Sequence, residues 1–315
     1  MKKTFLVILS VILFLSGLHA QESQTEYNFL HLPHSAHAAA LGGDNISIIE
    51  DDEALIFHNP AMLANVSDKT LNLNYMNYMS GTNSLSASFN RIIKQRASVA
   101  VSAQYIDYGS MKQTDENNID LGDFSAKDIA FAGYFSYMLT DKLVGGITAK
   151  LITSYIGDYN SIGVGVDLGL NYFDEDLDLS VSAVAKNLGG QVKAYDETYE
   201  RMPIDVQVGA TKRLTHTPFR FSLTAVDLNH WGYKFINHLV FGVDLLITDN
   251  IWVGGGYNFR RANEMTIAGL DTESSHGAGL SFGAGLNLDR FKVNLAYGKY
   301  HVSSSSILIG VAYSL

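Results

Sequence analysis

Three histidines at three-residue spacing are the first side chains in this chain that could do chemistry. His31, His34 and His37 would suit a metal site if cysteines or carboxylates followed at matching intervals. The chain has no cysteine, and no carboxylate stands at such an interval. We therefore interpret the three rings as polar groups that are hydrogen-bonded inside the fold, and we predict no metal and no cofactor.

Two further groups contain carboxylate or histidine side chains, which enzymes often use in catalysis. Glu50 to Glu53 form an acidic run, which we interpret as a solvated turn on the periplasmic side. His230 and Trp231 are adjacent, but no catalytic partner stands at a recognisable spacing from them. No nucleophile motif, phosphate loop or paired-carboxylate site stands out, so the sequence predicts a protein that is not an enzyme.

The N-terminus has the composition of a secretory signal. Lys2 and Lys3 precede an apolar run from Phe5 to Leu15, and the small residue Ala20 marks the expected cleavage point. This pattern predicts a signal peptide at residues 1–20, because the run is shorter than the roughly 20 residues that a spanning helix needs. A net charge of -10 disfavours nucleic acid and anionic lipid as partners.

From Thr70 onward, apolar side chains alternate with small or polar ones. Ile162 to Tyr172 show this most clearly, and Ile307 to Leu315 carry the alternation to the end of the chain. A period of two is that of a β-strand whose two faces meet different surroundings. The segments number about fourteen: 70–79, 82–92, 97–106, 131–139, 143–155, 162–172, 177–185, 206–210, 219–225, 239–247, 251–259, 280–288, 291–297 and the terminal strand.

Alternation alone fits either a soluble sandwich or a membrane barrel, and the lengths of the connections favour the barrel. The connections after strands four, six, ten and twelve are tight. The intervening ones, at about 107–124, 187–203, 227–237 and 259–277, are long and polar. Outer-membrane barrels sort short periplasmic turns and long outer loops in this way. We therefore predict an all-β protein, an antiparallel transmembrane barrel of about fourteen strands spanning residues 67–315 and surrounded by membrane lipid.

The polar strand residues agree with a barrel, because they share the phase opposite the apolar stripe. In a barrel this phase lines the lumen, whereas a charge facing the middle of the bilayer would cost about 2–4 kcal/mol. The residues are Asp128, Asp167, Asp205, Gln207, Arg220, Asp244 and Asn294.

Residues 21–66 precede the barrel and do not alternate. Ser35 to Leu41 favour a short helix that the following two glycines would end, and Ile46 to Ile49 favour a brief strand. Pro60 after Asn59 would begin a last helical turn. The segment is apolar but too short to fold alone, so we predict that it is a plug, or hatch, inside the lumen.

The plug carries a resemblance to a known family. The runs Ala39 to Gly43 and Ile56 to Ala61, with the acidic run between them, resemble the hatch of the FadL-like outer-membrane barrels. Its most specific part is the hatch motif Asn59, Pro60 and Ala61. Within that family, Phe29 to His37 resemble the opening of the PorV/PorQ branch, which belongs to the type IX secretion system. Ala183 to Gly190 and Gly279 to Leu286 also look like the family.

The resemblance implies a role in the attachment complex of type IX secretion. A barrel of this branch would anchor a PorZ-like surface protein beside the PorU sortase and the PorV shuttle, which process secreted cargo and attach it to the surface. Loops on a rigid scaffold usually carry binding, so Tyr195, Trp231 and Tyr233 are candidate partner-facing residues, with membrane contact or loop packing as the alternative.

Two other functions stay open. A FadL-like transporter of hydrophobic small molecules would show an apolar cavity near Asn59 and Pro60. A phospholipase-like barrel would need a serine, a histidine and a polar orienting group in register, and none is visible in the sequence.

Overall fold

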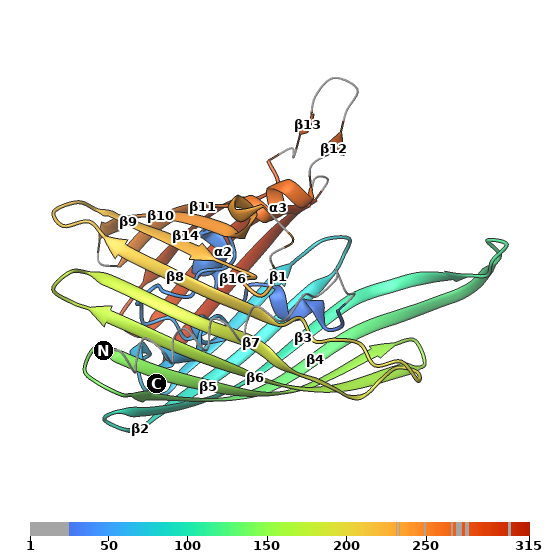
Figure 1. Ribbon diagram of the computed structural model, residues 1–315, viewed down its shortest axis with the longest axis horizontal. Helices are drawn as coiled ribbons and strands as arrows, with labels where there is room; N and C mark the ends of the chain where they lie inside the picture. Colours follow the sequence, from blue (N-terminus) through green and yellow to red (C-terminus); the bar gives the residue numbers. More distant parts are fainter. Residues whose placement is uncertain are drawn as a thin grey trace.

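The computed structural model describes residues 25–230, 232, 234–248, 250–265, 267–268, 273–274, 277–301 and 304–315, with the backbone alone at 267–268, 273–274 and 301. Fourteen of the described strands form one closed antiparallel barrel (Figure 1). They are β1 (Thr70–Asn77), β2 (Asn83–Lys94), β3 (Ala97–Thr114), β4 (Asp120–Met138), β5 (Leu143–Ile156), β6 (Tyr159–Asp174), β7 (Leu179–Lys193), β8 (Asp205–Arg213), β9 (Phe219–Ala225), β10 (Leu239–Thr248), β11 (Ile251–Asn258), β14 (Leu280–Asn287), β15 (Phe291–His301) and β16 (Ser304–Ser314).

The barrel closes where the last strand meets the first. Thr70 of β1 lies opposite Ser314 of β16, and Asn77 lies opposite Ile307. Closure leaves no free sheet edge along this seam, which is what a strand assembly inside lipid requires. The prediction of a barrel of about fourteen antiparallel strands is confirmed.

The two faces of the strands differ as the alternation predicts. The seven polar residues assigned to the lumen phase are all buried, while apolar side chains such as Leu168 and Ile309 are exposed on the outside. Exposed aromatic side chains cluster near the ends of this outer band, as at the two boundaries of a bilayer. Those nearest the short turns are Tyr137, Tyr172, Phe219, Phe291 and Tyr313, and those nearest the long connections are Tyr75, Tyr105, Phe241, Phe282 and Tyr297.

The strands differ greatly in length, so the barrel has a high and a low side. β3 and β4 have 18 and 19 residues, whereas β9 has 7 and both β11 and β14 have 8. A membrane-crossing strand needs about 9–11 residues. The short strands therefore end near the level of the bilayer surface, while β3 and β4 continue far beyond it as a two-stranded ribbon (Figure 1).

The ribbon lies where the sequence predicts a long loop. Most of the loop predicted at about 107–124 is strand, because β3 runs to Thr114 and β4 begins at Asp120. The connection predicted at about 187–203 is likewise shorter, because β7 runs to Lys193. The last two long connections hold short elements: η4 (Phe235–His238), α3 (Phe259–Glu264) and the small pair β12 (Ile267–Ala268) and β13 (Glu273–Ser274). None of the helices in the described part of the chain is long and apolar enough to cross a membrane.

Residues 25–66, called here the plug segment, lie inside the barrel (Figure 1). Their elements are η1 (Asn28–His31), α2 (Ala36–Ala40), η2 (Glu53–Phe57) and η3 (Pro60–Asn65). The brief strand predicted at Ile46 to Ile49 is wrong, since these residues have no regular structure. Ile48 instead packs in the apolar centre of the segment, against Leu41, Leu55 and Met62, while Ser47 forms a hydrogen bond with Thr211 of β8.

Candidate functional site

Capping residues and glycines in the plug segment begin and end its short helices. Ser35 caps α2, since its side chain accepts a hydrogen bond from the Ala38 amide at 3.2 Å. Gly42 and Gly43 then take φ values of 105° and 103°, a region that favours glycine and ends the helix. Asn59 caps η3 through a 2.9 Å bond from the Ala61 amide, with Pro60 at the first helical position.

Glycines in the wall make room for the plug segment. A side chain on Gly256 of β11 would meet backbone atoms of Leu41 and Gly42 at less than 3.0 Å, closer than real Cβ atoms approach. A side chain on Gly146 of β5 would meet the Pro60 and Ala61 backbone in the same way. Because these contacts are to backbone, the wall and the plug segment fit closely at both places, and no room is left beside the hatch motif.

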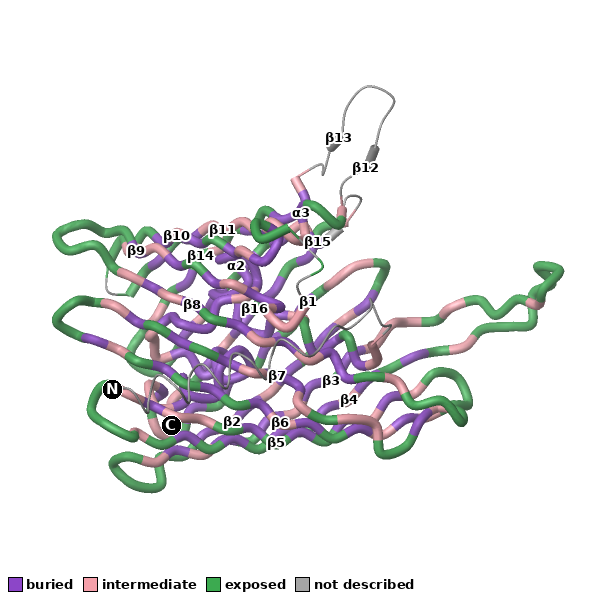
Figure 2. The backbone as a smooth tube through the Cα atoms, viewed as in Figure 1, coloured by how far each residue is buried: buried purple, intermediate pink, exposed green. Residues whose placement is uncertain are grey.

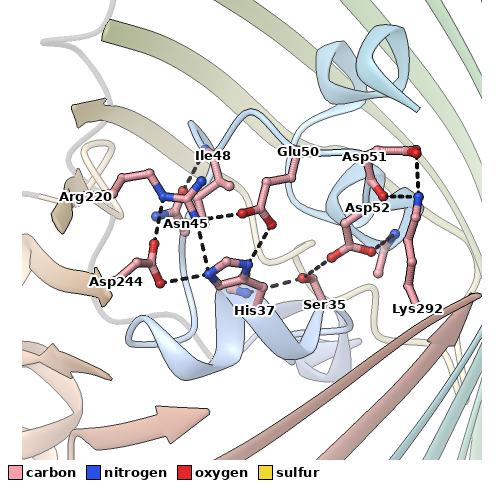
Figure 3. A network of polar contacts seen from close by, with 12 residues as sticks. Ser35, His37, Asn45, Ile48, Glu50, Asp51, Asp52, Arg220, Asp244 and Lys292 are labelled. Carbon is pink, nitrogen blue, oxygen red and sulfur yellow. Dashed lines mark hydrogen bonds and ion pairs between the residues drawn. The ribbon is translucent and has the colours of Figure 1, made fainter. Parts of the chain in front are cut away.

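The strongest connection between plug segment and wall is a buried cluster of four charged groups (Figure 3). His37 of α2 lies 2.7 Å from a Glu50 oxygen and 2.8 Å from an Asp244 oxygen on β10. Arg220 of β9 bridges the same two carboxylates at 2.7 and 2.8 Å. The Trp252 ring stacks on the His37 ring at 3.5 Å. Both nitrogens of His37 lie against carboxylate oxygens, to which an imidazolium can donate from each, and Arg220 Nη2 also lies 3.3 Å from Nε2.

The charges within the cluster shift the pKa values of its plug residues. Burial lowers the pKa of His37, but Glu50 and Asp244 outweigh it and raise the pKa from 6.5 to about 9. Burial raises the pKa of Glu50, but His37 and Arg220 outweigh it and lower the pKa from 4.5 to about 2. The cluster thus pairs two cations with two carboxylates at neutral pH.

These shifts predict how stability depends on pH. A raised histidine pKa contributes stability that is present below about 6.5 and is lost as the pH rises through about 9. A lowered carboxyl pKa contributes stability that is present above about 4.5 and is lost as the pH falls through about 2. We expect the melting temperature of the wild type to exceed that of His37→Gln most at pH 5–6, and the difference to shrink toward pH 9. A difference that stays constant from pH 6 to pH 9 would contradict this assignment.

The acidic run is not the solvated turn that the sequence analysis predicted. Besides Glu50, Asp52 accepts a 2.9 Å hydrogen bond from Ser35, and Asp51 pairs at 2.5 Å with Lys292 of β15. Glu53 is fully buried, and burial raises its pKa to about 8, so it carries a proton at neutral pH. Glu50 and Asp51 therefore connect the plug segment to the wall, because barrel residues far away in sequence supply their partners, and Asp51 stays partly exposed, with 37% of its side chain accessible.

The other two histidines of the spaced trio lie in different surroundings. His34 is buried beside the Phe57 ring, at 4.7 Å between ring centres, and burial lowers its pKa to about 3. His31 is exposed toward a cavity at the far end of the plug segment. Three-residue spacing along the chain thus does not bring the three rings together.

That cavity has a volume of about 720 Å³ and lies in the mouth at the long-connection end. Its wall is formed at the low side of the barrel, by Asp205 at the start of β8, Val226 after β9 and Asn258 at the end of β11. Above Lys186, which pairs with Asp205, β7 continues from Asn187 to Lys193 without a partner on its β8 side among the described strands. The cavity therefore lies next to the point where the pairing of β7 with β8 ends, at Asp205.

The lining combines apolar side chains with two arginines, Arg260 and Arg261, and with four carboxyl groups, Asp44, Asp205, Asp227 and Glu264. Ile204, Met265 and Tyr300 supply apolar surface. The Arg261 guanidinium lies over the Tyr300 ring, 3.8 Å from its centre, and donates to the Gly42 carbonyl at 3.2 Å. Its Nη1 is buried with no hydrogen-bond partner among the described residues. A ligand with an apolar body and a polar end fits such a lining.

Of the three candidate partner-facing loop residues, the structure describes only Tyr195. Tyr195 is half-buried and donates a hydrogen bond to Ser154 of β5, so it folds back onto the barrel rather than facing outward. Trp231 and Tyr233 lie outside the described residues, and their partner-facing role stays a prediction. Sequence reasoning missed Arg261 and the His37 cluster, because both depend on contacts between distant segments.

Comparison with known proteins finds likeness in structure. No protein-family model and no curated protein matches the chain. The chain is 16% identical to the Pseudomonas putida toluene transporter TodX, over 90% of this chain and 98% of that one, with a TM-score of 0.58. It is 12% identical to the monoaromatic hydrocarbon channel CymD, over 90% of this chain and 97% of that one, with a TM-score of 0.60. It is 11% identical to a FadL homologue from Pseudomonas aeruginosa, over 89% of this chain and 98% of that one, with a TM-score of 0.55. The chain thus has the fold of the FadL-like outer-membrane barrels.

Proposed function

We propose that this protein is an outer-membrane channel for small, mostly apolar molecules that carry a polar end. The observation that supports this most is the mouth cavity on the low side of the barrel, beside the short strand β9. In this proposal, molecules dissolved in the outer leaflet enter there. The long connections then face the outside, the short turns and the C-terminus face the periplasm, and Thr25, the first described residue, lies in the lumen at the mouth cavity. The likeness in fold to a toluene transporter and to a hydrocarbon channel supports the proposal.

In this proposal the mouth cavity is the entry site and the plug segment is the gate. The cavity contacts the plug segment at His31, Leu32 and Asp44. Below the mouth cavity the plug segment packs closely against the wall, since a side chain on Gly169 of β6 would lie less than 3.0 Å from Asn59 Oδ1 and from Pro60 Cδ. The mouth cavity does not reach Asn59 or Pro60. Passage toward the periplasm therefore requires the plug segment to move, and the His37 cluster must open.

Binding of octanoate and of toluene to the protein in lipid nanodiscs tests the entry site. Arg261→Ala removes the guanidinium whose Nη1 has no hydrogen-bond partner among the described residues, so octanoate should bind about 10–100-fold more weakly, since hydrogen bonds to charged groups contribute about 1.5–3 kcal/mol. Toluene, which has no polar end, should bind as to the wild type. Ile204→Trp fills the cavity and should abolish binding of both. Equal octanoate binding by wild type and Ile204→Trp would contradict the site.

A second candidate function is attachment in type IX secretion, supported by the resemblance of Phe29 to His37 and of the hatch motif. The several ion pairs that fasten the plug segment favour it too, because an anchor needs no opening. In this role the barrel would hold a PorZ-like surface protein beside the PorU sortase and the PorV shuttle. Purification from the native outer membrane should then recover the PorZ-like protein, and deletion should release surface-attached cargo.

A further inference from the structure

The ribbon formed by the outer ends of β3 and β4 has two free edges. β3 pairs with β2 only as far as Asp107, and β5 pairs with β4 only from Ala126. Beyond these points the two strands pair only with each other, as in Met111 opposite Phe124. Isolated two-stranded ribbons are marginally stable in water, and their unpaired backbone groups can accept a further strand.

The ribbon nevertheless has a defined conformation, with a bend at its base and a hydrogen-bonded turn at its tip. A register shift between Asp107 and Ser110, with Gly109 at a φ of 77°, bends it where it leaves the barrel. At the tip, one oxygen of Asp115 accepts hydrogen bonds from the Asn117 and Ile119 amides at 2.9 and 2.8 Å. The ribbon is thus shaped to project a defined edge into solution (Figure 2).

The β4 edge carries both apolar and acidic side chains. Ile119, just before β4, and Leu121, at a register shift within β4, are 59% and 58% exposed. The tip and both strands together hold four carboxylates, against Lys112 as the one basic residue between 108 and 125: Asp115, Glu116, Asp120 and Asp123. Like charges keep copies of this chain apart along such an edge, whereas a basic strand would be attracted.

We infer that the ribbon docks an extended, basic segment of a soluble protein, which adds as a strand to the free edge of β4. The added strand would lie in line with β5, which stops at Ile156. It would place apolar side chains beside Ile119 and Leu121 and basic ones beside Asp120 and Asp123. The inference does not depend on the transport proposal, because the ribbon lies outside the mouth cavity.

A peptide of alternating lysine and valine, eight residues long, is the probe. It is titrated onto the full chain in nanodiscs of zwitterionic lipid, with empty nanodiscs as the blank. The peptide should bind the protein, the glutamate–valine analogue should not, and a lysine–valine peptide N-methylated at alternate residues should bind at least tenfold more weakly. The methyl groups remove the amide donors that strand addition requires.

Variants of the ribbon complete the test. Asp120→Asn with Asp123→Asn should weaken binding at least tenfold and reduce its dependence on salt, whereas Asp158→Asn, in the neighbouring exposed turn, should not change it. Leu121→Pro should abolish binding while octanoate binding in the mouth cavity stays intact. Equal binding of the methylated and unmethylated peptides would overturn strand addition, and equal binding to empty nanodiscs would overturn the site.

Discussion

Replacing Arg220 by alanine should release the plug segment from the barrel wall. Without the guanidinium, Glu50 and Asp244 keep only His37 between them, and one carboxylate is left buried without its cation. Breaking a buried ion pair from one side typically costs about 3–5 kcal/mol. The population of the open state should therefore rise by roughly two orders of magnitude or more.

Thiol labelling measures this opening. The chain has no cysteine, so Ser47→Cys places a single thiol in the plug segment at a fully buried position. A maleimide should label this thiol slowly in the parent and about 100-fold faster when Arg220→Ala is added. Arg213→Ala, which removes an exposed arginine at the end of β8, is the matched control and should leave the rate unchanged. Equal labelling rates in the Arg220→Ala and Arg213→Ala variants would show that the cluster does not hold the plug segment.

Gly146→Ala should have the second largest effect, although it adds a single methyl group. The new Cβ would lie less than 3.0 Å from backbone atoms of Pro60 and Ala61, and backbone in a capped turn cannot move aside cheaply. Overpacking of this kind costs about 1–3 kcal/mol, and here the clash with backbone places the cost at the upper end. We expect a lower melting temperature and faster labelling at Ser47→Cys.

Gly133→Ala on the adjacent strand is the control, because nothing lies within 4 Å of a Cβ there. It should melt like the wild type. If both alanine variants melt alike, the hatch motif does not pack against β5 as described.

The barrel could be predicted from sequence because every strand meets two different environments. Leu168 faces outward and Asp167 faces the lumen, so the period of two reports directly on the fold. Closure by the terminal strand was predictable for the same reason, since Ile307 to Leu315 alternate up to the end. The boundaries of the signal peptide and of the plug stay predictions.

The contacts inside the lumen were not predictable. The acidic run looks like a solvated turn until Arg220 and Lys292, from strands far away in sequence, are placed beside it. The sequence predicts a loop where the ribbon lies because Asp115 to Asn118 break the alternation, while the strands on either side continue past the membrane. Periodicity shows which face a residue occupies, but it does not show which distant residue lies opposite.

The most direct test of the proposed channel asks whether uptake requires the plug segment to move. Ser47 Oγ and Thr211 Oγ1 of β8 lie 2.8 Å apart, so cysteines at both positions should form a disulfide that fastens the plug segment to the wall. Uptake of labelled octanoate is measured in cells that lack other channels for apolar compounds. We predict uptake above the empty-vector level when the disulfide is reduced, and uptake at that level when it is oxidised. Equal uptake in both states, or no uptake by the wild type, would contradict the proposed channel.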